Sequence, residues 1–164
     1  MPSPQQITVE DVRAAQKTIR GVALRTPLIP AFGLSERFGA EILLKLETLQ
    51  PTGAFKLRGA ANAVANLPEA ARSRGVVCSS TGNHGRAVAH AARSAGIRAV
   101  VCLSRLVPDV KVKAIEALGA EVRIIGASQD DAQVEVDRLV AEEGMTMVPP
   151  FDDPHIIAGQ GTLG

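Results

Sequence analysis

The chain has 164 residues, of which 46% are hydrophobic and 21% charged, a composition typical of a globular protein with one sizeable core and not of a disordered chain. Eighteen basic side chains nearly balance seventeen acidic ones, and with no Trp, no Tyr and four Phe there are few aromatic rings on which bases could stack, so we expect no nucleic-acid partner. The first residues show no apolar core of the signal-peptide type, and no apolar run approaches the roughly 20 residues of a membrane span, so we expect no membrane partner and a cytoplasmic location.

Residues 1–50 predict a helical arm that leads into a strand. Thr8 and Asp11 have the spacing of a helix N-cap and its acidic partner, and apolar residues recur on one face of the following helix until Gly21 ends it. The elements expected next are an extended stretch over residues 25–28, a short helix over 34–38 and a strand over 41–46.

After residue 68 the chain predicts a regular alternation of strands and helices. The predicted strands cover residues 75–78, 98–102, 121–125 and 145–148, and the predicted helices cover 84–94, 109–118 and 129–142. Short apolar strands that alternate with helices are typical of an α/β fold with a parallel sheet between two helical layers. In the helix over 129–142, a buried stripe is expected from Ala132, Val136, Leu139 and Val140. Residues 155–164 predict the start of one more helix.

The two cysteines each end a short apolar run of the strand type. Neither Cys78 nor Cys102 has His or carboxylate neighbours at the spacing of a metal site. We interpret both as buried core thiols and expect no metal.

Lys56 stands where a strand passes through a turn into a helix. The turn contains Pro51, Thr52 and Gly53, and it delivers Lys56 to the first helical turn. Small and apolar neighbours leave this helix with little polar face on which a lysine would be solvated. A lysine amine in dry surroundings loses its proton more readily, and the neutral amine is a nucleophile that forms a Schiff base with a carbonyl. The alternative is an ordinary solvated lysine, which describes most lysines on helices.

A second candidate site is the stretch Ser79–Gly85, between a strand and the start of a helix. The free N–H groups and the positive dipole end of a helix N-terminus bind carboxylate or phosphate. Because ligands of parallel sheets gather at the carboxyl ends of the strands, this loop and the Lys56 turn are expected to face one crevice. The alternative is a plain capped turn, since Ser, Thr, Gly and Asn are common cap residues. For His84, a cap or carboxylate contact is favoured over acid–base catalysis.

Four stretches in the same order carry a resemblance to a known family. They are Arg25-Thr26-Pro27-Leu28, the lysine segment TGAFKLRGA with KLE just before it, Ser80-Thr81-Gly82-Asn83-His84-Gly85, and Gly159-Gln160-Gly161-Thr162. Together they resemble the fold-type-II pyridoxal-phosphate enzymes, in particular the serine/threonine dehydratase family. Within it, QPTGAFKLRGAANAV and STGNHGRAV are most similar to the hydroxyectoine-utilisation dehydratases.

The resemblance implies a tryptophan synthase beta-like fold of two domains. Residues 1–50 would form an N-terminal arm and the first strand of the larger domain, 51–150 the small α/β domain, and 151–164 a crossover into the larger domain. Most of that second domain would be missing, together with the glycine-rich phosphate loop expected after Gly164. The chain is thus expected to be an N-terminal fragment.

The resemblance also assigns site residues. Lys56 would hold pyridoxal 5'-phosphate as a Schiff base, Phe55 would pack against the cofactor ring, and Asn83 would hydrogen-bond its ring oxygen. The substrate carboxylate would be received by Ser80, Thr81, Asn83 and His84. Thr81 stands where the serine racemases of the family carry a second catalytic serine, which argues against racemisation but not against elimination.

The function implied is a dehydratase or ammonia-lyase of amino-acid metabolism. It would eliminate water from threonine, serine or a hydroxyectoine-derived amino acid and yield a 2-oxo acid and ammonia, with the parent protein a homodimer. Two alternatives stay open: an inactive fragment of such an enzyme, and a non-catalytic Rossmann-like module that holds a nucleotide or another anion on the loop over 80–85. An anion-binding module does not need a lysine in apolar surroundings. In addition, the dinucleotide pattern G-x-G-x-x-G is absent after the first strand.

Overall fold

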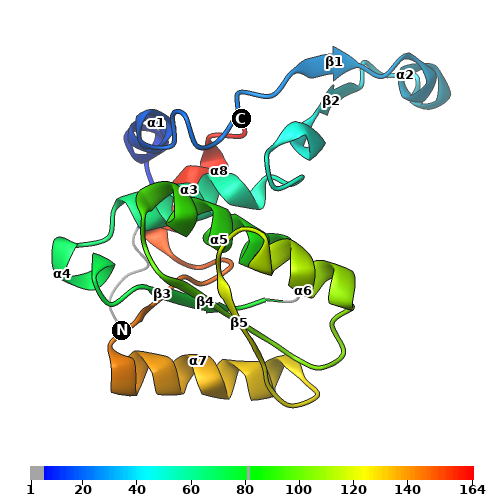
Figure 1. Cartoon of the computed structure of the whole chain (residues 1–164). Helices are drawn as coiled ribbons and strands as arrows, with labels where there is room; N and C mark the ends of the chain where they lie inside the picture. The colour runs from blue at the N-terminus through cyan, green and yellow to red at the C-terminus, as the bar shows by residue number, and fades with distance from the viewer. Residues whose placement is uncertain (1–5, 81) are drawn as a thin grey trace.

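A computed structural model describes residues 6–80 and 82–164 of the chain. Within these residues, the main sheet has four parallel strands in the order β5–β4–β3–β6. The strands are β3 (Val76–Ser79), β4 (Ala99–Leu103), β5 (Glu121–Ile124) and β6 (Thr146–Met147). Helices α5 (Asn83–Ala95) and α6 (Asp109–Glu116) cover one face of this sheet, and α7 (Gln129–Glu143) covers the other (Figure 1). The predicted α/β fold with a three-layer parallel sheet is confirmed.

The two central strands are buried along their whole length because helices lie on both faces. Every residue of β3 and β4 is buried, which is why their sequences are runs of valine and other small apolar residues without polar alternation. Cys78 belongs to the apolar cluster on the α5 side, whereas Cys102 belongs to the cluster on the α7 side. The interpretation of both as buried core thiols is confirmed, and burial raises the pKa of the Cys102 thiol to about 11.

Helix α3 (Lys56–Ala65) lies between α5 and α8 (Pro154–Gly161), and α1 (Val9–Thr18) packs on α8. The α3–α8 contact depends on glycines: a Cβ atom on Gly159 would lie 2.6 Å from the Arg58 carbonyl oxygen and the Gly59 Cα. Two backbones that approach this closely fix the first residue of α3, Lys56, against the rest of the fold.

The predicted elements are found with shifted ends. Helix α1 begins with the expected capping box, in which Thr8 accepts from the Asp11 N–H and the Asp11 carboxylate accepts from the Thr8 N–H. The predicted strand over 41–46 is shorter, β2 (Leu43–Lys45), and it pairs antiparallel with β1 (Leu28–Pro30). Two short helices were not predicted, η1 (Glu47–Leu49) and α4 (Glu69–Arg72). Their few residues carry no periodic signal.

One core prediction is wrong. On α7, Ala132, Val136 and Leu139 are buried as expected, but Val140 is 38% exposed. At 3.6 residues per turn, Val140 lies about 80° around the helix from Ala132, at the margin of the apolar stripe.

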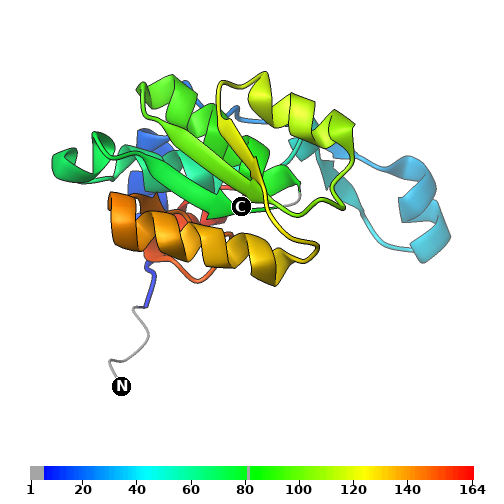
Figure 2. The same cartoon turned by 60° about the horizontal axis from the view of Figure 1, so that its bottom comes forward.

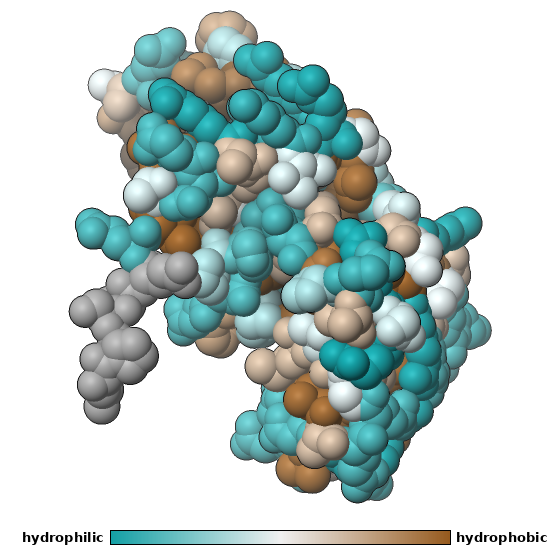
Figure 3. All heavy atoms as spheres, turned by 90° about the vertical axis from the view of Figure 1, so that its left-hand side faces the viewer, coloured by the Kyte–Doolittle hydropathy of each residue, from teal (hydrophilic) through white to brown (hydrophobic). Residues whose placement is uncertain are grey.

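The segment made of β1, α2 (Phe32–Phe38) and β2 projects away from the sheet layers in both views (Figures 1 and 2). The opposite side of the molecule, with α1 and α4, is mostly polar, and its apolar side chains form small separate groups (Figure 3). Over the described residues, no helix combines the length and the apolar character needed to cross a membrane.

Candidate active site

The site lies where the order of the strands reverses. From β3 the chain moves outward to β4 and β5, and α7 then returns it to place β6 on the other side of β3. Ligands of open parallel sheets bind at the carboxyl ends of the strands at such a reversal. The segments that leave β3 and β6 at this edge begin with Ser80 and Val148.

Lys56 reaches this edge of the sheet from the first residue of α3. Its Nζ donates a hydrogen bond of 2.7 Å to the carbonyl oxygen of Pro150, in the segment that follows β6. The side chain is half-buried, and Nζ lies 5.6 Å from the centroid of the Phe55 ring. The amine is thus held at the wall of the site instead of extending into bulk water. The Phe55 ring is 40% exposed and is accessible to a ligand beside the amine.

His84 contacts the same segment from α5. The residue is 4% exposed, and its Nε2 lies 2.9 Å from the carbonyl oxygen of Val148. Burial lowers the pKa of His84, the hydrogen bond to Val148 offsets part of this effect, and the positive charge of Lys56 lowers the pKa further. The structure therefore brings Lys56 and His84 together on residues 148–150.

The loop before α5 is organised by Ser80. The Ser80 hydroxyl oxygen accepts hydrogen bonds from the N–H groups of Gly85 (2.9 Å) and Gly82 (3.3 Å), so it acts as a cap for this helix end. Helix geometry leaves the N–H groups of Asn83 and His84 without partners inside the helix. The Asn83 side chain is exposed, and its Oδ1 accepts from Arg86 at 2.7 Å. Thr81, also predicted to bind the substrate carboxylate, lies outside the described residues.

Three buried side-chain atoms have no hydrogen-bond partner among the described residues: Thr52 Oγ1, His84 Nδ1 and Gln160 Oε1. All three residues adjoin the start of α3. Thr52 is in the turn before Lys56, the Gln160 amide nitrogen lies 3.5 Å from the Lys56 carbonyl oxygen, and His84 shares the Val148–Pro150 segment with Lys56. An unpaired buried polar atom is unfavourable, so these three side chains have hydrogen-bonding capacity that the described chain does not use.

Several residues at this edge of the sheet were not predicted from the sequence to be part of a site. Thr52 and Gln160 were noted only as members of motifs, and the carbonyl oxygens of Val148 and Pro150 have no side-chain signal at all. The one signal available was the Pro149-Pro150 pair directly after a predicted strand, because consecutive prolines supply carbonyl acceptors and no N–H donors.

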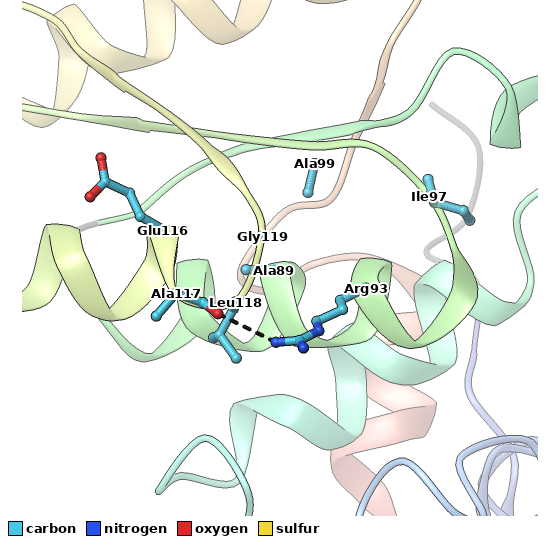
Figure 4. Close-up of a pocket in the computed structure, with 8 residues that line it drawn as sticks. All are labelled: Ala89, Arg93, Ile97, Ala99, Glu116, Ala117, Leu118 and Gly119. Carbon is cyan, nitrogen blue, oxygen red and sulfur yellow. Dashed lines mark hydrogen bonds between the residues drawn. The ribbon is translucent and has the colours of Figure 1, made fainter.

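Two other hollows lie away from Lys56 and the loop before α5. One of about 360 Å³ lies near the C-terminal ends of α5 and α6, where Arg93 donates to the Ala117 carbonyl (Figure 4). Another of about 480 Å³ is lined by α1, α3 and the start of α8. None of the three unpaired atoms belongs to the residues that line either hollow. In the described part of the chain, no group of three or more His, Cys, Asp or Glu side chains is placed to hold a metal ion.

The fold and site thus define an α/β protein with a half-buried lysine amine at the carboxyl edge of its parallel sheet. In comparisons with known proteins, residues 19–164 match the family model described as pyridoxal-phosphate dependent enzyme. The chain belongs to this family.

The relatives agree with this family. A threonine dehydratase homologue of Sinorhizobium fredii is 56% identical over 158 residues, which cover 96% of this chain and 48% of that protein. The L-threonine ammonia-lyase of Thermotoga maritima is 47% identical over 158 residues, 96% of this chain and 39% of that protein. Among solved structures, maize serine racemase superposes with a TM-score of 0.93 at 33% identity, covering 97% of this chain and 48% of that one. The chain spans about half the length of these relatives or less.

The residues of the site fit the family's cofactor, pyridoxal phosphate. Lys56 offers an amine for its aldehyde, and the accessible Phe55 ring lies beside that amine. Asn83 has its Oδ1 engaged by Arg86, so its Nδ2 is left to donate to a ring oxygen.

Proposed function

We propose that the protein is a pyridoxal-phosphate-dependent dehydratase that converts a β-hydroxy amino acid into a 2-oxo acid and ammonia. One observation carries the proposal: a half-buried lysine amine is held on the Pro150 carbonyl, in the same segment that the His84 ring contacts beside the N-terminus of α5. The names of the relatives, a threonine dehydratase homologue and an L-threonine ammonia-lyase, support this reaction.

In this proposal Lys56 has two tasks. Its amine would hold the cofactor through the aldehyde when no substrate is bound, and as a free amine it would be the base that takes the proton from the α-carbon of the substrate. Pyridoxal phosphate, when bound, supplies an acceptor for the negative charge that develops at that carbon. Phe55 packs against the cofactor ring, and Asn83 donates to the ring oxygen.

The loop before α5 receives the substrate carboxylate in this proposal, through Ser80, Thr81, Asn83 and His84. Support comes from the helix N-terminus itself, since the N–H groups of Asn83 and His84 have no partner inside the helix and the dipole favours an anion. The Ser80 hydroxyl contributes indirectly, because it holds the N–H groups of Gly82 and Gly85 and thereby shapes the loop.

The finer assignment concerns the substrate. Threonine, serine and hydroxyectoine-derived amino acids all present the carboxylate and the β-hydroxyl that this chemistry needs, and we propose hydroxyectoine utilisation on the wording of the two motifs alone. Elimination is favoured over racemisation because Thr81 replaces the second serine of the racemases.

The test uses the full-length protein and its Lys56→Ala variant. We expect the wild type to bind pyridoxal phosphate with a new absorbance band, to become irreversibly labelled at Lys56 on borohydride reduction, and to release ammonia from a β-hydroxy amino acid. The variant should lose the band and the label, and at least about a hundredfold in ammonia release, because it lacks the base. Full activity in the variant would end the assignment. A melting temperature raised by a nucleotide and not by pyridoxal phosphate would instead support a binding module.

A further inference from the structure

Both Lys56 and His84 contact backbone carbonyl oxygens of the segment Val148–Pro150. Lys56 Nζ lies 2.7 Å from the Pro150 oxygen, and His84 Nε2 lies 2.9 Å from the Val148 oxygen. These contacts join residues that are 94 and 64 positions apart in the sequence. The position of the Lys56 amine therefore depends on how this segment is fixed.

The hydrogen-bond partner of His84 determines the form of its ring. A backbone carbonyl only accepts, so Nε2 must carry a proton to bond with Val148. His84 Nδ1 is buried without an acceptor among the described residues, which makes a second proton on the ring unfavourable. The ring is thus a neutral imidazole with hydrogen on Nε2, and burial and the nearby Lys56 charge lower its pKa in the same sense.

Val148 is held through both of its backbone polar groups. Its N–H donates to the Val77 oxygen of β3 at 2.9 Å, while its carbonyl accepts from His84. The two residues that follow are prolines, whose ring restricts φ and which lack an N–H for any other anchor. Fixing Val148 therefore also restricts where the Pro150 carbonyl can lie.

The far end of the segment is also constrained. Asp152 is the one non-glycine residue with positive φ, 54°, in the described part of the chain, and the Asp153 side chain accepts from the Ile156 N–H at 3.0 Å as the cap of α8. Between these two ends, the His84 ring contacts the Val148 carbonyl, two residues before the carbonyl that accepts from Lys56.

We propose that His84 is a positioning residue for Lys56: its neutral ring anchors Val148 and so holds the Pro150 carbonyl where the Lys56 ammonium rests when it is not joined to a cofactor. The ring then does not act as a charged ligand of the substrate carboxylate, and His84 meets a carboxylate only through its backbone N–H. The catalytic meaning of this arrangement rests on the proposed function, but the contacts themselves can be tested in the cofactor-free protein.

The first measurement needs no variant. In a ¹⁵N spectrum of the cofactor-free, full-length protein at neutral pH, His84 should show an unprotonated Nδ1 and a protonated Nε2. A charged ring, or a proton on Nδ1, would overturn the proposal.

The second measurement follows the ammonium protons of two lysines. Lys56 and Lys45 each donate to a backbone carbonyl, Lys45 to Thr26 at 2.9 Å, so both should exchange with water slowly enough to give a ¹H–¹⁵N signal. Lys45 is the matched control because its acceptor has no contact with His84. In His84→Leu the Lys56 signal should be lost while the Lys45 signal stays.

The conservative variant His84→Gln distinguishes loss of the contact with Val148 from a general destabilisation of the fold. His84→Gln keeps a donor near Nε2, so it should restore the Lys56 signal, whereas His90→Leu on the same helix should leave both signals unchanged. A Lys56 signal that persists in His84→Leu would refute the proposal. If His84→Leu does not fold, the proposal is still tested by the tautomer of His84 in the wild type and by the Lys56 signal in His84→Gln. Failure to bind pyridoxal phosphate would refute the proposed function and leave these readouts intact.

Discussion

Lys56 and Arg58 stand two residues apart at the start of α3, yet their surroundings are opposite in kind. Arg58, 4% exposed, donates four hydrogen bonds, two to the Glu47 carboxylate, one to the Leu24 carbonyl and one to the Thr162 hydroxyl. Lys56 donates one hydrogen bond, to the Pro150 carbonyl, and Thr52, His84 and Gln160 each have a buried side-chain atom that lacks a partner in the described chain. The Arg58 side chain is thus fully engaged in hydrogen bonds, whereas the Lys56 amine has a single protein partner in the described chain.

The Arg58 network connects the N-terminal arm to the helix that carries Lys56. Glu47 also accepts from Thr26 and Gln50, and Gln50 exchanges hydrogen bonds with both backbone groups of Leu24. Burial alone would raise the pKa of Glu47, but the hydrogen bonds from Arg58, Thr26 and Gln50 and the Arg58 charge together lower it below the ordinary value. The carboxylate is therefore ionised and dependent on Arg58.

The largest effect is expected from breaking this pair. Arg58→Met should lower the free energy of unfolding by about 3–5 kcal/mol, because it leaves the Glu47 carboxylate buried without its partner. Urea unfolding measures the change. Arg13→Met, which breaks an exposed pair with Glu10, is the control and should change stability by less than about 1 kcal/mol. The double variant Arg58→Met with Glu47→Gln should recover part of the loss, and equal losses in the single and double variants would contradict the reasoning.

A smaller effect is expected where α3 meets α8. Gly159→Ala should lower stability by about 1–3 kcal/mol, because the new methyl group would meet the backbone at Arg58 and Gly59 and force the helices apart. Thermal unfolding measures it. The control is Gly33→Ala in α2, where a Cβ meets nothing within 4 Å and should stabilise by about 0.5–1 kcal/mol. If both substitutions stabilise the protein, they contradict the close approach of the α3 and α8 backbones at Gly159.

Of the contrast between Lys56 and Arg58, the sequence predicted the special surroundings of Lys56 but not the buried network of Arg58. The alternation of strands and helices predicted the parallel sheet, because apolar periodicity is a local property, and the motif around Lys56 indicated a Schiff-base lysine. Nothing local indicated that Arg58 is buried, since its partners Glu47 and Leu24 come from residues 1–50 and Thr162 directly follows α8. Long-range polar pairing has no periodic signature.

The same limit applies at the site. The sequence led us to Ser80 and His84 as carboxylate contacts, but the structure gives the Ser80 hydroxyl to the N–H groups of its own loop and the His84 ring to a carbonyl 64 residues away. The division into residues 1–50, 51–150 and 151–164, the homodimer and the cytoplasmic location stay predictions. Phe32 and Phe38, in the projecting segment made of β1, α2 and β2, are exposed.

A modest pH effect should reveal the neutral His84. Because its pKa in the folded protein is lowered from the ordinary value of 6.5, the unfolded chain takes up this proton first as the pH falls. The contribution of His84 to stability is then complete above pH 6.5 and is lost as the pH falls toward the folded pKa. Urea unfolding of wild type and His84→Gln between pH 5 and 8 isolates this slope. If the free energy of unfolding of the wild type depends on pH no more steeply than that of His84→Gln, the His84 ring has the same pKa in the folded and the unfolded chain, which would contradict this prediction.

The smallest change in stability is expected at the residue with the largest role in function. Lys56→Met removes one hydrogen bond to Pro150, whose carbonyl belongs to a half-buried residue and remains within reach of water, so the free energy of unfolding of the cofactor-free protein should fall by no more than about 1 kcal/mol. Arg58→Met, two residues away and with the same new side chain, should lose about 3–5 kcal/mol. Urea unfolding of both variants compares the two sides of one helix turn with the side chain held constant. A loss at Lys56 as large as that at Arg58 would mean that the amine is part of the structural network.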